Sequence, residues 1–119
     1  MSAPIFVLVH GAYHGAWCWE RLIPLLAARG ARVAAPDLPG HGADRTPTPA
    51  LSLSLYADHV AEAVRRIEAP VTLVGHSMAG AVIAEVAERV PDALSRLVYL
   101  TAYMPTDGES ILDWARRDE

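Results

Sequence analysis

Short runs of consecutive apolar residues recur along the chain. Four of them occupy residues 5–9, 31–35, 71–74 and 94–100, each flanked by glycine, proline or a charged residue. None alternates apolar with polar positions, which is typical of strands buried on both faces of a sheet covered by helices. The pattern therefore predicts four parallel strands.

Helical spacing of apolar residues fills the intervals between these runs. Helices are predicted between residues 22 and 30, between Ser54 and Pro70, over residues 79–90, and from Ser110 onward. Gly30 is the expected C-terminal cap of the first helix, and Ser54 is the expected N-cap of the second. The alternation of strands and helices predicts an α/β fold, a parallel sheet with flanking helices and right-handed crossovers.

Length and composition narrow the class of protein. The 119 residues suffice for one domain, and 52% hydrophobic against 20% charged residues exclude an intrinsically disordered chain. Fourteen acidic and ten basic residues give a net charge of -4, which leaves no cationic surplus for nucleic acid or an anionic membrane surface. We therefore expect neither kind of partner.

The single cysteine and the start of the chain indicate the compartment in which the protein is expected. Cys18 has no second cysteine to pair with, so we expect no internal disulfide, no cysteine-based zinc site and a reducing compartment. The apolar run at residues 5–9 is too short for a secretory signal, and no stretch reaches the ~18 apolar residues of a membrane span. These features predict a soluble, cytoplasmic protein.

One segment carries a reactive residue in a recognisable setting. The sequence VGHSMAG, residues 74–80, follows the third predicted strand and opens the third predicted helix. A serine at such a turn, among small residues, is typical of a nucleophile elbow, in which strand and helix backbones pass at contact distance. Ser77 is thus the predicted nucleophile. Ala79, where the usual pattern has glycine, is interpreted as a tolerated variant.

A dinucleotide-binding loop is the competing interpretation of Gly75, Ser77 and Gly80. That motif requires an acidic residue at the end of the next strand, where this chain has Thr101 and Ala102. The elbow is therefore the favoured interpretation.

A second loop follows the first predicted strand. Its sequence is HGAYHGAW, residues 10–17. A loop at this position can direct a backbone N–H toward the elbow, so the N–H groups of Ala12 and Met78 are the predicted oxyanion-hole donors. Taken alone, Gly11 and Gly15 also fit ordinary turn chemistry.

Together these segments resemble the N-terminal half of the α/β-hydrolase fold. More narrowly they resemble the plant-type methylesterases, salicylate-binding esterases and hydroxynitrile lyases with their bacterial relatives. The matching stretches are residues 6–17, 36–42, 74–80 and 97–105. The resemblance implies that Ser77 is the nucleophile and that Ala12 and Met78 supply the oxyanion hole. The substrate-binding residues expected beside them are Gly11, His14, Tyr103 and Met104.

The resemblance also implies that residues 1–119 are a single partial domain. Residues 1–104 would form the core sheet and helices, and residues 105–119 the start of a helical cap. In the family, the catalytic aspartate and histidine follow later, so the C-terminal half of the fold would be missing and the isolated chain nearly inactive. The edge of the fourth strand would then be exposed, which predicts self-association.

No residue of the chain is expected to replace the missing base and acid. The histidines are assigned other roles: His76 away from the substrate, His10 ordering its loop, His41 in a turn, His59 on a helix surface and His14 at the rim of the site. Asp37 and Asp107 are interpreted as loop residues.

Ester hydrolysis is the predicted chemistry. A small carboxylic ester would be cleaved through an acyl-Ser77 intermediate, without cofactor or metal. Lyases of the family carry threonine at the position of Gly11, which disfavours cyanohydrin cleavage as a third possibility. A non-catalytic module that binds a small apolar acid or ester, or interacts with a partner, is the alternative from another class.

Overall fold

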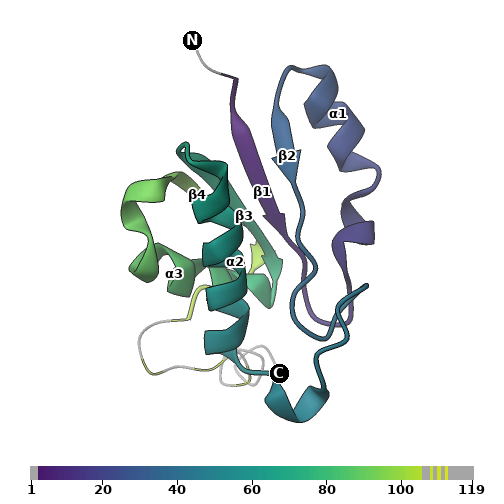
Figure 1. Ribbon diagram of the computed structural model, residues 1–119, viewed down its shortest axis with the longest axis vertical. Helices are drawn as coiled ribbons and strands as arrows, with labels where there is room; N and C mark the ends of the chain where they lie inside the picture. Colours follow the sequence, from purple (N-terminus) through teal and green to yellow (C-terminus); the bar gives the residue numbers. More distant parts are fainter. Residues whose placement is uncertain (1–2, 106–107, 109, 111, 113–119) are drawn as a thin grey trace.

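Four parallel strands form one sheet in the computed structural model, which describes residues 3–105 together with Gly108, Ser110 and Leu112. The strands are β1 (Ile5–Val9), β2 (Arg32–Ala34), β3 (Val71–Ser77) and β4 (Leu94–Ala102). Their order across the sheet is β2-β1-β3-β4, and every neighbouring pair is parallel (Figure 1). The predicted parallel sheet is confirmed.

Helices cover both faces of this sheet. The helices are α1 (Leu22–Ala28), α2 (Leu53–Ile67) and α3 (Ala79–Arg89), with short 3-10 helices at Ala16–Trp19, Thr48–Ala50 and Pro91–Ala93. Figure 1 shows α1 on one side of the sheet and α2 and α3 on the other. The α/β fold class predicted from the alternation of elements is therefore also confirmed.

The two faces of the sheet explain why the strands carry unbroken apolar runs. Val7 and Val9 of β1 are buried in the larger core with α2 and α3. Leu8, which points the opposite way, is buried with Trp19 beneath α1. Each residue of the strand thus faces a helix layer, and no position is left for a polar side chain.

The strands differ from the predicted ones mainly at their carboxyl ends. β3 continues three residues beyond its apolar run because Gly75, His76 and Ser77 pair with Tyr99, Leu100 and Ala102 of β4. β4 extends to Ala102 for the same reason, whereas β2 is shorter than predicted. Hydrogen bonding to a neighbouring strand, rather than hydrophobicity, sets these limits.

Two predicted helix caps had different outcomes. Gly30 ends α1 as predicted: its φ is +88°, its N–H donates to Ala27 O (3.0 Å), and Ala31 N–H donates to Leu26 O (3.1 Å). The predicted N-cap Ser54 is wrong. Ser52 caps α2, because its hydroxyl accepts a hydrogen bond from Leu55 N–H (3.0 Å).

Two other predictions concern the end of the sheet and the end of the chain. β4 is an edge of the sheet formed by the described residues, and Leu100 on it is 42% exposed. Self-association through this edge stays a prediction, which the concentration dependence of sedimentation would test. The helix predicted from Ser110 falls mostly outside the described residues.

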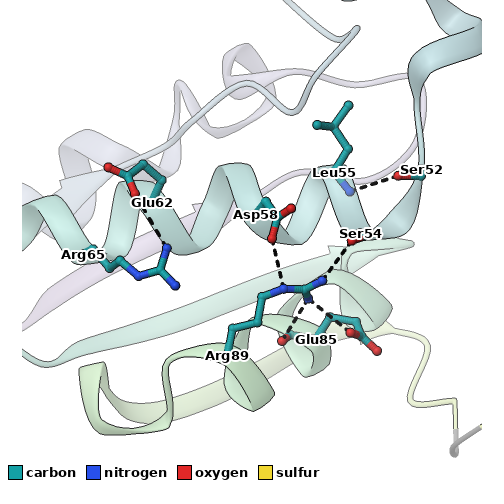
Figure 2. Close-up of polar contacts among 8 residues, drawn as sticks. All are labelled: Ser52, Ser54, Leu55, Asp58, Glu62, Arg65, Glu85 and Arg89. Atoms are coloured by element: carbon teal, nitrogen blue, oxygen red, sulfur yellow. Dashed lines mark hydrogen bonds and ion pairs between the residues drawn. The ribbon is translucent and has the colours of Figure 1, made fainter.

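Arg89, at the end of α3, ties this helix to α2 (Figure 2). Its guanidinium lies 3.1 Å from a carboxylate oxygen of Asp58 and donates to Ser54 Oγ (3.1 Å), both on α2. The same group donates to the Glu85 carboxylate (3.1 Å) on its own helix. Because α3 begins at Ala79, two residues after Ser77, this contact helps to fix the helix that follows the serine.

Replacing Arg89 by methionine is expected to lower the free energy of unfolding by about 1–2 kcal/mol, since several charge-assisted hydrogen bonds are lost together. Urea unfolding followed by circular dichroism measures this loss. Arg65→Met is the matched control, because Arg65 only pairs at 3.7 Å with Glu62 on the exposed side of α2, and it should cost less than about 0.5 kcal/mol. Equal effects of the two substitutions would show that the helix-to-helix contact contributes nothing.

Candidate active site

Ser77 lies at the turn between β3 and α3, in a backbone conformation that few residues other than glycine adopt. Its φ is +55°, in the left-handed region, whereas Met78 already has helical angles of -51° and -32°. A residue other than glycine in this region stores strain of about 1–3 kcal/mol, which the surrounding packing must hold. This backbone geometry is that of the predicted nucleophile elbow.

The packing around the turn explains which neighbours must be glycine. A Cβ on Gly75 would lie 2.7 Å from the carbonyl oxygen of Ala79, and a Cβ on Gly80 would overlap the carbonyl oxygen of Tyr103. Ala79 itself is fully buried with its methyl group in place. The alanine that departs from the usual motif is thus accommodated, and the close backbone approach falls on Gly80.

The loop after β1 lies directly against the elbow. A Cβ on Gly11 would be 3.1 Å from Ser77 Cβ and 3.2 Å from the carbonyl oxygen of His76. The loop then turns back through a hydrogen bond from His14 N–H to Gly11 O (3.3 Å), with Tyr13 at a φ of +62°. Ala12, the predicted oxyanion donor, is therefore held on a tight turn next to Ser77.

A cavity of about 1160 Å³ opens beside the elbow. Its described lining residues are Ala12, Leu53, Tyr56, Ser77, Met78, Ala81, Ala84, Glu85, Glu88, Tyr103, Pro105, Gly108, Ser110 and Leu112. The volume is ample for a small organic ligand. The cavity lies at the carboxyl ends of the strands, where ligands of open parallel sheets generally bind.

The structure brings four of the seven predicted site residues to this cavity, namely Ala12, Ser77, Met78 and Tyr103. Gly11, His14 and Met104 are not among its lining residues. Gly11 instead lies against Ser77 and His76 of the elbow, and Met104 is 58% exposed. Their predicted contacts with substrate stay predictions.

His10 is fully buried, and both of its ring nitrogens are engaged. Nε2 accepts a hydrogen bond from Leu38 N–H (3.0 Å), so the proton lies on Nδ1, which donates to Gly11 O (2.8 Å). Burial lowers the pKa of His10. A neutral ring with both nitrogens occupied matches the predicted role of ordering the loop.

The stability of the fold is expected to fall as the pH drops below 6.5, the ordinary pKa of histidine. Because burial lowers the pKa of His10 in the fold, the unfolded chain binds more protons between this lowered value and 6.5. The contribution of His10 is present in full above pH 6.5 and is lost as the pH falls through the folded-state pKa. Urea unfolding at a series of pH values measures the loss.

A His10→Gln variant should lose this part of the pH dependence, because glutamine does not titrate in the interval. His59→Gln is the control, since His59 is exposed on α2. A His10→Gln variant with the same pH dependence as the parent would contradict the prediction.

The remaining histidines also have defined surroundings. His14 Nδ1 lies 2.8 Å from Ala12 O, and its ring stacks on Trp17 with a centroid distance of 5.5 Å. His76 meets Trp19 edge to face at 6.3 Å, on the α1 side of the sheet. His41 Nδ1 lies 3.0 Å from Pro39 O. No hydrogen bond within the described part of the chain joins the Ser77 hydroxyl to a histidine.

Asp37, interpreted from the sequence as an ordinary loop residue, makes hydrogen bonds that the sequence did not predict. One carboxylate oxygen accepts a hydrogen bond from Ala16 N–H (2.7 Å), and the other accepts one from Ala43 N–H (3.2 Å). It thereby joins the loop after β2 to the loop after β1. Asp107, the other aspartate considered in the sequence, lies outside the described residues.

Over residues 3–105 and the three further described positions, no three His, Cys, Asp or Glu side chains are grouped to hold a metal ion. Within the same part of the chain, no helix has the length and apolar character needed to cross a membrane.

The geometry of the elbow, the neighbouring loop and the cavity agrees with a comparison of sequences. Residues 6–118 match the family described as alpha/beta hydrolase. The chain belongs to this family. Methylesterase 2 of Arabidopsis thaliana is 42% identical to this chain over 104 residues, 84% of this chain and 40% of the plant protein. Pyrethroid hydrolase of Sphingobium wenxiniae is 38% identical over 109 residues, 91% of this chain and 39% of that protein.

Solved structures agree with the same assignment. Polyneuridine aldehyde esterase superposes with a TM-score of 0.87 at 31% identity, over 98% of this chain and 47% of that one. An extracellular alpha/beta-hydrolase from a Paenibacillus species, reported to share homology with tobacco salicylic acid binding protein 2, gives 0.86 at 32% identity over 92% and 45%. The chain spans about two fifths of the length of these two curated relatives and matches their N-terminal part.

Proposed function

We propose that this chain carries the nucleophile and the oxyanion hole of a carboxylic-ester hydrolase. The observation that carries the proposal is the left-handed turn at Ser77, which opens on a cavity lined by Ala12 and Met78. Glycine would adopt the same backbone conformation without strain, so packing alone does not explain a serine between the buried strand and the helix. The names of the relatives, methylesterase and pyrethroid hydrolase among them, support ester hydrolysis as the reaction class.

In the proposed reaction, Ser77 Oγ attacks the carbonyl carbon of the ester while a base accepts the hydroxyl proton. The carbonyl oxygen becomes an oxyanion that accepts hydrogen bonds from the N–H groups of Ala12 and Met78, beside the positive end of the α3 dipole. When the tetrahedral intermediate collapses, the alcohol leaves with the proton from the base. Water then attacks the acyl-Ser77 ester by the same route and releases the carboxylic acid and the free serine.

The base is proposed to come from outside the described residues. His10 and His14 are held by hydrogen bonds of their own, and His59 is exposed on α2. A serine hydroxyl is a weak nucleophile without a base within reach, so the 119-residue chain by itself should hydrolyse esters only slowly. The complete catalytic machinery would include a histidine and a carboxylate beyond those that the structure describes.

The lining of the cavity points to a small, uncharged ester. Leu53, Met78 and Ala81 present apolar surface, and the charged residues among the described lining residues, Glu85 and Glu88, are both acidic and disfavour an anionic group. An apolar wall holds the acyl or alcohol part by burial of its surface. A substrate with a hydrophobic body and a single ester group therefore fits the site best.

Labelling with a fluorophosphonate, with imidazole supplied as an external base, tests the proposal. We expect intact-mass spectrometry to show one adduct on the chain, whose formation accelerates with imidazole concentration. The Ser77→Ala variant should show none. Ser95→Ala is the matched control, because Ser95 lies at the opposite end of the sheet with its hydroxyl on Val71 O (3.2 Å), and it should label like the parent.

An adduct that persists in Ser77→Ala would overturn the assignment of the nucleophile. Absence of any adduct on a folded chain, together with saturable binding of an uncharged ester by NMR titration, would favour the non-catalytic binding module instead. Because imidazole supplies the base in this experiment, the second outcome separates the two functions.

A further inference from the structure

The tip of the loop of residues 10–16 supplies little to hold the loop in place. Tyr13, at its tip, is 97% exposed and has a left-handed backbone, so no packing holds this residue in place. The internal hydrogen bonds, from His14 to Gly11 and Ala12, shape the turn but do not fix it relative to the sheet. Besides the edge-to-face contact of the His14 ring with His76 of β3 (6.0 Å) and the close approach of Gly11 to Ser77, the position of the loop therefore depends on contacts at its ends.

Asp37 supplies the contact at the distal end. Its Oδ1 accepts the hydrogen bond from Ala16 N–H at 2.7 Å, across 21 residues of sequence. Ala16 is the first residue of the 3-10 helix Ala16–Trp19, whose N-cap Gly15 offers no side chain to cap it. Asp37 thus caps this helix from another loop, and a carboxylate on backbone N–H groups is a strong form of hydrogen bond.

Two glycines make room for this carboxylate. A Cβ on Gly15 would lie 3.0 Å from Asp37 Oδ1, and a Cβ on Gly42 would lie 2.5 Å from Asp37 Cγ. Ala43 N–H, next to Gly42, donates to the second oxygen at 3.2 Å. The half-buried carboxylate therefore lies between the loop after β1 and the backbone of its own loop at residues 42–43.

His10 fixes the proximal end of the same loop in the same way. Its ring joins Gly11 O to Leu38 N–H, and Leu38 is the neighbour of Asp37. Both ends of the loop that carries Ala12 are thus hydrogen-bonded to one short segment at residues 37–38.

We propose that Asp37 is a positioning residue for the oxyanion hole: by holding Ala16 and Ala43 it fixes the loop that directs the Ala12 N–H toward Ser77. The inference rests on the proposed function for its chemical consequence, but not for its structural one. Asp37 lies in the loop after β2 and makes its hydrogen bonds to backbone, so it acts through the loop and not on the substrate.

The test compares three variants of the whole chain. Asp37→Ala removes both acceptors, whereas Asp37→Asn keeps one oxygen for Ala16 N–H and presents an amide N–H₂ to Ala43 N–H. Asp44→Asn is the matched control. Asp44 lies in the same loop and also accepts backbone hydrogen bonds, from Gly40 N–H (2.9 Å) and Thr46 N–H (2.8 Å), but it makes none to the loop after β1.

Two readouts are measured on each variant. Amide hydrogen exchange and chemical shifts of residues 11–16 report the position of the loop, and the maximal rate constant of imidazole-assisted fluorophosphonate labelling reports the oxyanion hole. We expect faster exchange at Ala16 and shifted Ala12 resonances in Asp37→Ala, with a loss of about 10²-fold in the rate constant, as for a displacement of about 1 Å. Asp37→Asn should recover about tenfold of this loss because it restores one hydrogen bond. Asp44→Asn should stay within about twofold of the parent, because it leaves the hydrogen bonds of Asp37 to Ala16 N–H and Ala43 N–H in place.

Several outcomes would overturn the inference. An Asp37→Ala chain that folds with unchanged amide signals in residues 11–16 would show that the loop does not depend on Asp37. A displaced loop with an unchanged labelling rate would show that the oxyanion hole does not depend on Asp37. Equal losses of the labelling rate constant in Asp37→Asn and Asp37→Ala would show that the hydrogen bond to Ala16 N–H does not account for the loss. If the parent chain is not labelled at all, the proposed function fails, and the amide measurements alone decide whether Asp37 positions the loop.

Discussion

Replacing Gly80 by alanine is expected to destabilise the fold by about 3 kcal/mol or more, as for an overpacked core position with no room to adjust. The added Cβ would overlap the carbonyl oxygen of Tyr103 and lie 2.9 Å from its carbonyl carbon and 3.0 Å from its nitrogen. All three are backbone atoms, so no side-chain rotation relieves the overlap. Urea unfolding followed by circular dichroism measures the change.

The backbone of Tyr103 is itself held in place. Its N–H donates to Ser77 O (3.2 Å), and two residues earlier Thr101 takes a φ of +46°, an unusual value for a β-branched residue. The hydrogen bond to Ser77 O thus holds the segment after β4 at the elbow, where the Tyr103 backbone also contacts Gly80. A shift of Tyr103 to accommodate the methyl group would break the hydrogen bond to Ser77 O.

Whether Gly80→Ala raises or lowers the free energy of unfolding distinguishes helix propensity from steric overlap. Gly80 lies inside α3, where helix propensity alone predicts that alanine stabilises by about 1 kcal/mol. Gly30→Ala is the comparison: a Cβ there meets nothing within 4 Å, and only its φ of +88° opposes the change, at a cost of about 1–2 kcal/mol. A Gly80→Ala chain as stable as the parent would show that the helix does not approach Tyr103 so closely.

The sheet and the elbow were predictable because both depend on local sequence. Unbroken apolar runs mark strands buried on two faces, and β1 has the bounds that its run predicts. Ser77 stands out because a serine among small residues follows such a run and opens an amphipathic helix. In β3, however, Gly75 and His76 interrupt the hydrophobic signal although both pair with β4, so the strand was predicted too short.

The anchors of the loop after β1 were not predictable in the same way. Asp37 and Ala16 are 21 residues apart, and Leu38 and His10 are 28 residues apart, so no local pattern joins either pair. One signal was present: Gly42 and Asp37 belong to one loop rich in glycine and proline. Such glycines are usually interpreted as turn residues, whereas Gly42 here also makes room for a carboxylate.

The misassigned cap of α2 has a similar cause. Ser52 and Ser54 are equally good N-cap residues by type, and only the path of the chain decides between them. Ser52 has the extended backbone of a cap, and the hydroxyl of Ser54 is used instead by Arg89 from α3. A tertiary contact thus determined what the sequence left open.

Replacing Gly11 by valine is expected to lower the rate constant of imidazole-assisted Ser77 labelling by about 10²–10³-fold, the cost of losing one oxyanion-hole donor. A Cβ at this position would lie 3.1 Å from Ser77 Cβ and 3.2 Å from His76 O, and the branches of valine extend further. β3 is paired on both sides and cannot recede, so the loop must move, and the Ala12 N–H moves with it.

The control for Gly11→Val is a substitution at the tip of the same loop. Tyr13→Asn should leave the labelling rate within about twofold of the parent, because asparagine tolerates the left-handed backbone and the tyrosine ring is exposed to solvent. Circular dichroism and the urea midpoint establish that both variants fold. If Gly11→Val labels as fast as the parent while folded, the loop after β1 does not supply an oxyanion donor. The stabilisation would then come from Met78 N–H and the α3 dipole alone.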